Sequence, residues 1–370
     1  MAFAQCPHLI QICRIGGIKI AWYSSLTEEI TTVIRYTVCM KVSVIIPTYC
    51  TPEEKLRRCL ESAVCQTLPE LEIIVVDDNA ERAPQKAVEK IIRSFRQKST
   101  AVHAGDIRYI CHGRNLGLAA ARRTGVEEAA GAYVTMLDSD DEFRSPDACC
   151  TAYDASRNEV YDIVQFCAEP RREGAYILEK NKDAYRLIEH PFQGECRLSS
   201  SDAFAERFLT SGEFCLFLWG KLIKRETFKK ALERIPVMAC FMAEDLLYSY
   251  FTARESCSYI GIPDILYSYN LGNGISTSSD MITTLDRWEK LCSPALVFTA
   301  IMYDLKERPS PAGAGIYEYM RKCMMHFVIS NCMLLNRVQP ELRVRAHEIL
   351  EETWGPDIIH KAEANIREGQ

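Results

Sequence analysis

Apolar and polar positions along the first part of the chain follow two different periods, one typical of strands and one typical of helices. Short apolar runs rich in β-branched residues predict four buried strands, at residues 42–46, 71–76, 107–111 and 133–137. Amphipathic stretches with apolar residues at helical spacing follow the first three runs, at residues 51–66, 84–97 and 115–130. Strands and helices that alternate in this way predict an α/β fold, with a mainly parallel, Rossmann-like sheet and helices on both faces.

The pattern is less regular after residue 146. Helices are predicted at 147–157 and 199–209, strands at 163–167 and 265–269, and further short apolar runs at 214–218 and 259–262. From residue 283 onward the apolar spacing is helical, with Pro309 and Pro311 interrupting it. We therefore expect a regular half over residues 40–145, a second half over 146–282 and a C-terminal helical region over 283–370.

The first 39 residues differ from the rest of the chain. Their apolar stretch is interrupted by Arg14, Lys19 and two glycines, and it lacks the basic start and small-residue exit of a secretory signal. Met40 is followed at once by the first predicted strand, as at a natural chain start. We expect residues 1–39 to be an extension outside the main fold, and their place in the native protein stays open.

Composition narrows the class of protein. A chain of 370 residues with 48% hydrophobic and 25% charged residues is typical of a globular protein of one or two domains. The net charge of −6 lacks the basic footprint of nucleic-acid binding, and no apolar run approaches the roughly 18 residues that span a bilayer. Seventeen cysteines without metal or disulfide-framework spacing favour reduced thiols and the cytoplasm. A peripheral contact with a membrane is compatible with this composition.

Carboxylates gather at the ends of two predicted strands. Asp77 and Asp78 follow the second strand, and Asp138, Asp140 and Asp141 follow the fourth. Because parallel strands end on one edge of a sheet, we expect both groups to face one crevice. Such crowding raises carboxylate pKa values unless a cation compensates, and Mg²⁺ or Mn²⁺ prefers these oxygen ligands. The alternatives are a solvated acidic loop, a simple turn or a helix cap.

A third acidic pair, Glu244 and Asp245, opens an apolar stretch at 246–251. Carboxylates in a first helical turn complement the helix dipole, which is the structural interpretation. The functional interpretation is a general base, which needs only a carboxylate within reach of a hydroxyl. The sequence has no glycine-rich phosphate loop, so a metal together with Arg122 could carry the charge of a bound diphosphate.

Four segments resemble, in order, the motifs of family 2 glycosyltransferases of the GT-A fold. They are Val-Ser-Val-Ile-Ile-Pro-Thr-Tyr (42–49), Glu-Ile-Ile-Val-Val-Asp-Asp (72–78), Asn-Leu-Gly-Leu-Ala-Ala-Ala-Arg (115–122) and Gly-Ala-Tyr-Val-Thr-Met-Leu-Asp-Ser-Asp-Asp (131–141). Weaker similarities occur downstream at 219–225, 243–245, 267–269 and 275–277. Their order is similar to that in bacterial enzymes that decorate surface polysaccharides.

The resemblance implies a GT-A nucleotide-diphospho-sugar transferase fold and the activity of a hexosyl- or N-acetylhexosaminyltransferase. It implies an inverting, metal-dependent transfer of one sugar per event from a nucleotide sugar, with a UDP-sugar as the first choice. The acceptor would be a hydroxyl of a glycan or of a lipid-linked glycan, which fits the inner face of the cell membrane. Residues 40–145 would then bind the nucleotide sugar and residues 146–282 the acceptor.

The same resemblance implies roles for individual residues. The donor-binding residues would be Pro47, Tyr49, Asp78, Asn115, Arg122 and Asp138. The first three would line the base pocket, the next two would lie near the base or diphosphate, and Asp138 would approach the ribose or the metal. Asp140 would be the main ligand of Mn²⁺ or Mg²⁺, with Asp138 as its partner, and Asp245 would be the catalytic base. Trp219 and Lys221 are candidates for acceptor contacts, although tryptophan is also common in a protein core.

Some positions depart from the family pattern. Cys50 stands where asparagine is usual, Asn79-Ala80 replaces a common glycine-serine, and Asn270 replaces a frequent arginine, which puts phosphate contacts by that loop in doubt. Processive synthases carry Q-x-x-R-W, but here Thr284 precedes Arg287-Trp288 at the glutamine position. A single-transfer enzyme is therefore expected.

Three other functions stay open on the sequence alone. A haloacid dehalogenase-like phosphatase also has D-x-D after a strand, but normally after its first strand and with threonine or valine where Glu142 stands. A sugar-nucleotide pyrophosphorylase would need a glycine-rich, arginine-containing loop near its start. A catalytically inactive nucleotide-binding module would keep the fold, and Asp140 together with Asp245 argues against it.

Overall fold

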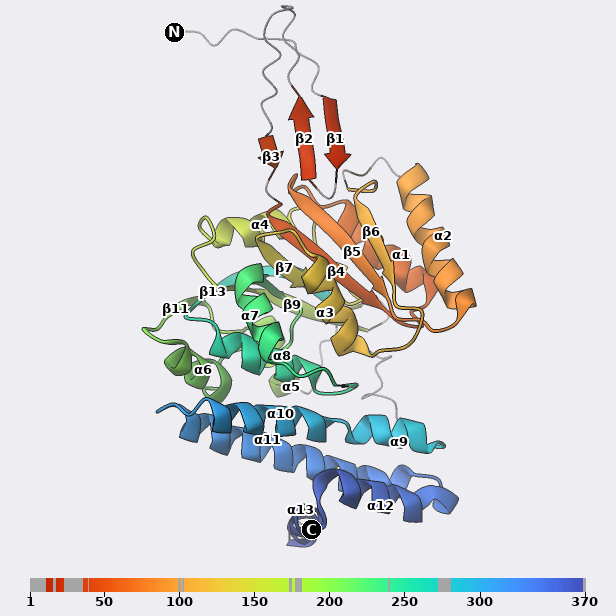
Figure 1. Cartoon of the computed structure of the whole chain (residues 1–370), viewed down its shortest axis with the longest axis vertical. Coiled ribbons are helices and arrows are strands. Elements are labelled where there is room, and N and C mark those ends of the chain that lie inside the picture. Colours follow the sequence, from red (N-terminus) through yellow and green to blue (C-terminus); the bar gives the residue numbers. More distant parts are fainter. Residues whose placement is uncertain are drawn as a thin grey trace, which may run out of the picture.

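A ten-stranded sheet organises the fold in the computed structural model (Figure 1). The structure describes residues 11–15, 18–22, 36–38, 40–98, 101, 103–172, 175–176, 182–238, 240–271 and 281–368. In spatial order the main strands are β11 (Gly194–Arg197), β13 (Ser258–Leu271), β9 (Ile163–Arg172), β12 (Lys221–Lys224), β7 (Tyr133–Met136), β4 (Val42–Thr48), β5 (Leu71–Asp77) and β6 (Ile107–Cys111). Two short strands complete the sheet: β10 (Ala175–Tyr176) pairs with β9, and β8 (Glu142–Phe143) pairs with β13.

The sheet is mixed but mostly parallel. β6, β5, β4 and β7 run parallel to one another, and β13 runs parallel to β9. β12 is antiparallel to both of its neighbours, β7 and β9, and β11 is antiparallel to β13. The four strands predicted for the first half are β4, β5, β6 and β7, so the predicted mainly parallel sheet is confirmed.

The first strand was predicted to end at residue 46, which was wrong, because β4 continues through Pro47 to Thr48. Proline is rarely found in a central strand, since it lacks the N–H that the ladder needs. The Ile45 carbonyl accepts from Leu137 N–H at 3.0 Å, and the pairing of β4 with β7 ends at Ile45 and Met136. Pro47 lies two residues on and faces the same side, where the ladder has already ended. The missing N–H therefore costs no strand pairing.

The two faces of the sheet carry separate hydrophobic cores. Val44 and Ile46 point to one face and pack with α1 (Glu53–Val64), α2 (Arg82–Lys98) and α4 (Ala148–Ala155). Ile45 points to the opposite face, where the core is built with α3 (Leu118–Glu128), α6 (Ser201–Thr210), α7 (Arg225–Arg234) and α8 (Glu244–Arg254). Successive strand residues alternate between faces, so one β-branched run serves both layers. This arrangement confirms the prediction of helices on both faces.

Helix α3 begins three residues later than predicted. The sequence pattern placed its start at Asn115, but residues 115–117 form a turn in which Gly117 has a φ of 89°. The Gly117 N–H donates to Asn115 Oδ1 at 3.0 Å and to Asp78 Oδ2 at 2.8 Å. A positive φ of this kind suits glycine and is incompatible with a helix. The turn fixes the helix start next to the end of β5.

The second half of the chain was predicted less well. The helices predicted at 147–157 and 199–209 are α4 and α6, and the strand predicted at 163–167 is the first part of β9. The runs at 259–262 and 265–269 belong to one irregular strand, β13. The run at 214–218 is a loop, and neither β12 nor α7 was predicted.

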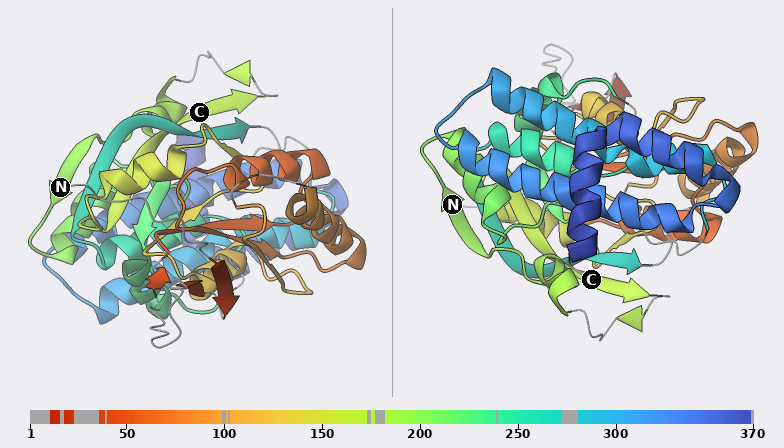
Figure 2. Two further views of the ribbon diagram at one scale, coloured as in Figure 1. Left: turned by 90° about the horizontal axis from the view of Figure 1, so that it is seen from above. Right: turned by 90° about the horizontal axis from the view of Figure 1, so that it is seen from below.

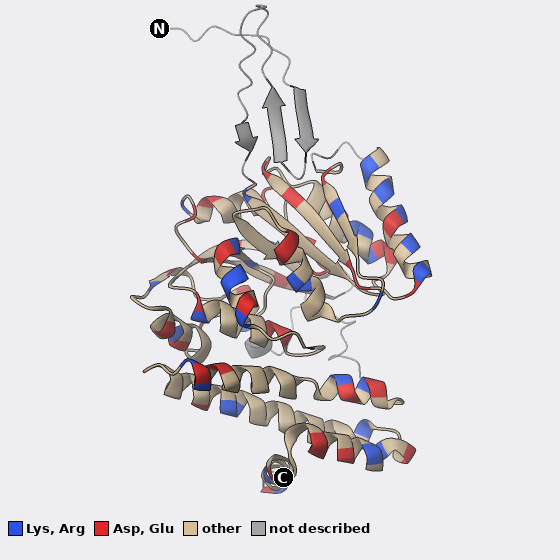
Figure 3. Ribbon diagram, viewed as in Figure 1, with Lys and Arg blue, Asp and Glu red and all other residues tan. Residues whose placement is uncertain are grey.

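Five α-helices lie within the described residues 283–368, which confirms the predicted C-terminal helical region. They are α9 (Leu285–Cys292), α10 (Pro294–Glu307), α11 (Gly313–Leu334), α12 (Arg343–Trp354) and α13 (Pro356–Glu368). Viewed from below, they form a layer across the molecule (Figure 2). Charged residues are frequent on α2 and α12, whereas long stretches of α10 and α11 carry none (Figure 3).

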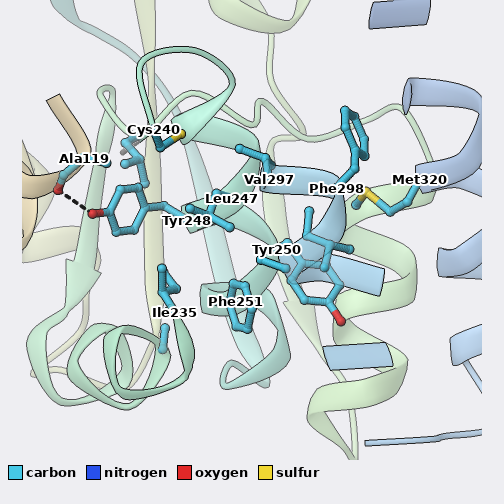
Figure 4. Packing of buried hydrophobic residues seen from close by; sticks show 14 of the residues in the cluster. Ala119, Ile235, Cys240, Leu247, Tyr248, Tyr250, Phe251, Val297, Phe298 and Met320 are labelled. Carbon is cyan, nitrogen blue, oxygen red and sulfur yellow. Dashed lines mark hydrogen bonds between the residues drawn. The ribbon is translucent and has the colours of Figure 1, made fainter. Parts of the chain in front are cut away.

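Helix α8 is the element that joins the sheet layer to the C-terminal layer. All of its residues from 247 to 254 are buried, which is expected of a helix enclosed on every side. The Tyr248 hydroxyl donates to the Ala119 carbonyl of α3 at 2.6 Å (Figure 4). Tyr250 turns the other way and donates to Asp304 of α10 at 2.7 Å. Helix α8 is thus held between α3 and α10.

The N-terminal segment contains three short strands. β1 (Gln11–Ile15), β2 (Ile18–Trp22) and β3 (Tyr36–Val38) form an antiparallel sheet of their own. The expectation that residues 1–39 form an extension outside the main fold stays a prediction.

We predict that Gly131→Ala destabilises the protein. A Cβ at Gly131 would lie 2.6 Å from the backbone nitrogen of Ser43 and 2.8 Å from the carbonyl oxygen of Tyr133, and neither atom can rotate away. Overpacking of this kind costs about 1–3 kcal/mol, measured as the free energy of unfolding in urea. Gly105→Ala is the matched control, because no atom lies within 4 Å of its added Cβ. Equal stability of the two variants would contradict the prediction.

Candidate active site

A cavity of about 680 Å³ opens beside the end of β7. Its lining includes the residues at the start of α8, the loop at 212–219 and the last part of β13. Five of the site residues proposed from sequence border it: Arg122, Asp138, Asp140, Trp219 and Asp245. Its size is that of a pocket for a small-molecule ligand.

Arg122 lies at the centre of the acidic side of this cavity. Its side chain is only 1% exposed, and it reaches three carboxylates that are distant in sequence. One terminal nitrogen donates to Asp138 Oδ1 at 3.0 Å, and the other donates to Asp245 Oδ1 at 2.9 Å and to Glu244 Oε1 at 3.2 Å. The planar, multidentate guanidinium suits such a bridge, which a lysine could not make. One side chain therefore fixes the strand-end aspartate and the start of α8 together.

The cluster has more negative than positive groups. Burial would lower the pKa of Arg122, but Asp245, Asp138 and Glu244 raise it, so the guanidinium stays charged. Burial and Asp245 raise the pKa of Glu244 to about 7. Burial also raises the pKa of Asp245, although Arg122 opposes this shift. Carboxylates shifted in this way are suited to exchange protons near neutral pH.

The backbone around Ala243 aims Glu244 and Asp245 at the cavity. Ala243 has a φ of 62°, a left-handed conformation that costs an L-residue about 1–2 kcal/mol. The Leu218 N–H also donates to Asp245 Oδ1 at 3.3 Å, so this oxygen has two donors. Among the hydrogen bonds of the described residues, none involves Asp245 Oδ2. Local strain of this kind is often found at functional sites.

The strand-end aspartates take different positions. Asp141 is buried and accepts from the Tyr267 hydroxyl and the Asn270 N–H, both at 2.7 Å, which anchors the loop to β13. The Asp140 side chain is 36% exposed, and Lys55 Nζ lies 3.8 Å from its Oδ2. Burial and the neighbouring Asp138 raise the pKa of Asp140. Asp140 and Asp138 thus present carboxylate oxygens to the cavity, while Asp141 holds the loop.

This donor set fits a divalent cation only in part. Within the described ranges, no group of three or more His, Cys, Asp or Glu side chains is arranged to hold a metal ion. The oxygens of Asp140 and Asp138 are hard ligands, and Mg²⁺ is commonly bound by one or two carboxylates together with substrate phosphates. The raised pKa of Asp140 is also the shift that a nearby cation would relieve. The residues fit a metal that arrives with a diphosphate rather than one held by protein alone.

The other predicted donor residues lie together at the ends of β4 and β5. Pro47 is buried, whereas Tyr49 is 50% exposed. The Asp78 carboxylate accepts from the Leu116 N–H at 2.9 Å and the Gly117 N–H at 2.8 Å, and it lies 2.8 Å from His112 Nδ1. Asn115 caps the same turn. Leu118 directly follows this turn and lines the cavity, so the two groups of site residues are neighbours.

Trp219 and Lys221, the two candidate acceptor residues, are almost fully buried, so little of either side chain is open to an acceptor. The Trp219 side chain is 3% exposed and stacks on Phe217 and Tyr269, with ring centroids 4.9 and 4.8 Å apart. Phe217 is the exposed member of this aromatic stack, at 38%. Lys221 is buried, and its ammonium group donates to the Phe217 carbonyl. Burial lowers the pKa of Lys221, while Cys215 and Asp245 raise it.

Some cavity residues were assigned no role from sequence. Glu244 was noted only as half of an acidic pair, and Asn270 only as a departure from the family pattern. Tyr267, which contacts Asp141 and does not itself line the cavity, was noted only as part of a weak similarity. Tyr267 and Asn270 both lie on β13 and donate to Asp141. In the sequence, only their position in or next to a short family motif could have indicated this contact. The similarity at 275–277 lies outside the described residues. Over the part of the chain that the structure describes, we find no helix with the length and hydrophobicity to cross a membrane.

Comparisons with known proteins agree on one family. The sequence model described as "Glycosyl transferase family 2" matches residues 43–243. The chain is 27% identical over 230 residues to the uncharacterized glycosyltransferase EpsJ of Bacillus subtilis, and 30% identical over 236 residues to the putative glycosyltransferase EpsH of the same organism. Each match covers 62% of this chain and 60% of the relative, so the matched region spans about three fifths of these relatives.

A solved structure shares the fold over most of this chain. The structure of TarS 1–349 from S. aureus in complex with UDP-GlcNAc has a TM-score of 0.51 and 18% sequence identity. The match covers 90% of this chain and 93% of that chain. At this identity the similarity shows the fold, and the GT-A fold expected from the sequence is confirmed.

Proposed function

The chain belongs to glycosyl transferase family 2, and from this premise we propose that it is an inverting, metal-dependent glycosyltransferase. It would move one sugar per event from a nucleotide-diphosphate donor to a hydroxyl acceptor, a glycan or a lipid-linked glycan. The observation that carries this proposal is the Arg122 bridge, which holds Asp138 and Asp245 at one cavity. A UDP-sugar is the first donor to test, because the similar TarS structure holds UDP-GlcNAc.

Asp245 is the proposed catalytic base. Its carboxylate borders the cavity and takes the proton of the acceptor hydroxyl as that oxygen attacks the anomeric carbon. The bond from the anomeric carbon to the phosphate oxygen breaks, and the nucleoside diphosphate leaves with the electron pair. Attack on the face opposite the leaving group inverts the anomeric configuration. The raised pKa of Asp245 makes it a stronger base than an exposed aspartate.

Asp140 is the proposed main ligand of Mn²⁺ or Mg²⁺, with Asp138 as its partner. A bound metal would act as a Lewis acid toward the departing diphosphate. Arg122 holds Asp138 in place, and both of its terminal nitrogens donate to carboxylates. We therefore assign Arg122 the role of a positioning residue, in addition to the diphosphate proximity expected from sequence.

Pro47, Tyr49 and Asp78 are the proposed base pocket, and Asn115 is proposed to lie near the base or the diphosphate. The exposed Tyr49 ring offers a face on which a base could stack. Asp78 and Asn115 order the turn at 115–117, which joins this pocket to the cavity. Trp219 and Lys221 remain candidate acceptor residues, and we propose that they act by supporting Phe217, which is stacked on Trp219 and hydrogen-bonded to Lys221.

A panel of nucleotide sugars tests the proposal. Release of nucleoside diphosphate is measured with and without Mn²⁺ or Mg²⁺, first alone and then with candidate acceptors. We expect one donor to give metal-dependent release that rises when an acceptor is added. Donor binding without release in any combination would favour an inactive nucleotide-binding module. Release of inorganic phosphate from simple phosphate esters would favour the phosphatase.

Asp140→Asn should remove metal-dependent nucleotide binding. A neutral amide is a weaker ligand for a hard cation, and we expect the affinity for UDP in the presence of Mn²⁺ to fall by at least about 10–100-fold. The measurement is the thermal stabilisation of the protein by UDP with and without Mn²⁺. Asp286→Asn is the control, since that carboxylate is 74% exposed on α9. Unchanged Mn²⁺-dependent stabilisation in Asp140→Asn would remove this residue as the ligand.

A further inference from the structure

The cavity has an apolar wall that none of the proposed roles uses. This wall is formed by residues of α5 (Lys182–Glu189), of α6 and of the loop after α6, all in the second half of the chain, and by residues of α11 in the C-terminal layer. Its members are Leu187, Ile188, Leu209, Leu216, Tyr319 and Phe327.

Charge is absent from this wall. Among the described residues that line the cavity, the charged ones are Arg122, Asp138, Asp140, Asp141, Glu244 and Asp245. All six belong to the acidic side, where Arg122 donates hydrogen bonds to Asp138, Glu244 and Asp245. The charged residues of α11 are Glu318, Arg321 and Lys322, and none of them lines the cavity.

The wall is also not a closed core. Ile188 and Leu209 are buried at its base, but Leu187, Leu216, Tyr319 and Phe327 are only half-buried. Sugar hydroxyls placed against such a surface would lose hydrogen bonds to water without replacement. A hydrocarbon chain placed there gains about three- to fourfold in affinity for each methylene buried.

We propose that the acceptor is an amphiphile whose hydrocarbon part lies along the apolar wall while its hydroxyl meets Asp245. This inference rests on the proposed function and narrows its acceptor from a glycan or a lipid-linked glycan to a molecule whose lipid-like portion itself lies in the site. Both surfaces line the same chamber, so one molecule can contact them at once. Phe217 lines the same cavity, one residue after Leu216 and two before Trp219.

Binding of n-octyl β-D-glucoside and methyl β-D-glucoside, compared by isothermal titration calorimetry, tests the inference. The ligands are used below the micelle concentration, with UDP and Mn²⁺ present, and they differ only in the alkyl chain. We expect one octyl glucoside per chain and at least a tenfold weaker affinity for the methyl glucoside. Equal affinity of the two ligands would overturn the inference.

Two leucine variants locate the binding site. Leu187→Asp places a charge on the apolar wall, and Leu296→Asp places the same charge on an exposed position of α10 outside the cavity. We expect octyl glucoside binding to fall at least tenfold in the first variant and to stay unchanged in the second. Equal binding by both variants would show that the detergent binds elsewhere and would overturn the inference. Tyr319→Asp replaces the first variant if circular dichroism shows that Leu187→Asp is unfolded.

The experiment separates this inference from the proposed function. Nucleotide binding and donor turnover without any alkyl-chain preference would leave the transferase standing and reject the amphiphilic acceptor. Alkyl-chain preference at the wall without nucleotide binding or donor turnover would reject the transferase and, with it, the acceptor role of the wall.

Discussion

Asp245→Asn should abolish acceptor-dependent sugar transfer while leaving nucleotide binding intact. An amide cannot take the proton of the acceptor hydroxyl, and loss of a general base typically lowers the rate by about 10²–10⁴-fold. The substitution keeps the shape of the side chain and an oxygen that can accept from Arg122 and the Leu218 N–H. The rate of nucleoside diphosphate release with acceptor is the measurement, and Mn²⁺-dependent stabilisation by UDP shows that the donor site survives.

Glu244→Gln is the matched control for this result. Glu244 is the adjacent carboxylate, is bonded to the same guanidinium nitrogen and lines the same cavity, but it has no proposed role in proton transfer. We expect this variant to keep most of the activity. In the unmodified protein the rate should rise with pH as Asp245 loses its proton, since burial raises its pKa, and Asp245→Asn should lack that rise. Activity within tenfold of normal in Asp245→Asn would remove the residue as base.

Arg122→Met should cost both stability and activity. It leaves Asp138, Glu244 and Asp245 near one another without their shared cation, and an unpaired buried charge typically costs about 3–5 kcal/mol. Urea unfolding gives the free energy, and donor turnover gives the activity. Arg93→Met on α2 is the control, because Arg93 is exposed and a surface substitution usually changes stability by about 0.5 kcal/mol or less.

The loss of stability should grow with pH. Without Arg122 the pKa values of Glu244 and Asp245 rise further in the folded state, because the cation that opposes their upward shift is gone, while in the unfolded chain they return to ordinary values. The folded state then binds more protons than the unfolded state, so stability falls as pH rises between about 5 and 8. Arg122→Lys should recover part of the stability but little activity, since one ammonium group cannot bridge three carboxylates. A stability difference that does not change with pH would argue against the bridge.

The first half of the fold could be predicted because its signals are local. Strands β4, β5 and β7 are buried on both faces and appear as apolar runs, and the edge strand β6 is a shorter run that is only partly buried. The helices between these strands show a plain helical period. The second half mixes antiparallel strands with loops, and its apolar runs are too short to tell one from the other. The run at 214–218 looks like a strand in sequence, yet it is the loop that carries Phe217 to the cavity.

The residues of the candidate site were predicted from the sequence, but the hydrogen bonds between them were not. Aspartates at strand ends are visible in sequence, and so is the carboxylate pair at 244–245. The bond between Arg122 and Asp245 joins residues 123 positions apart, and it depends on Tyr248 and Ala119 docking α8 against α3. No spacing rule encodes such a contact. For the same reason Arg122 was expected near the base or the diphosphate, whereas the structure shows it as a bridge between carboxylates.

The aromatic stack around Trp219 gives the protein a built-in optical signal. Of the four tryptophans, Trp288 and Trp354 are buried among the C-terminal helices, whereas Trp219 borders the cavity. Its indole ring also lies against Tyr267, whose hydroxyl holds Asp141. A ligand that settles on Phe217 or shifts the aspartate loop must therefore change the surroundings of this indole. Substrate arrival can be followed as a change in tryptophan fluorescence, in real time and without a label, at the place where the sugar is expected to move.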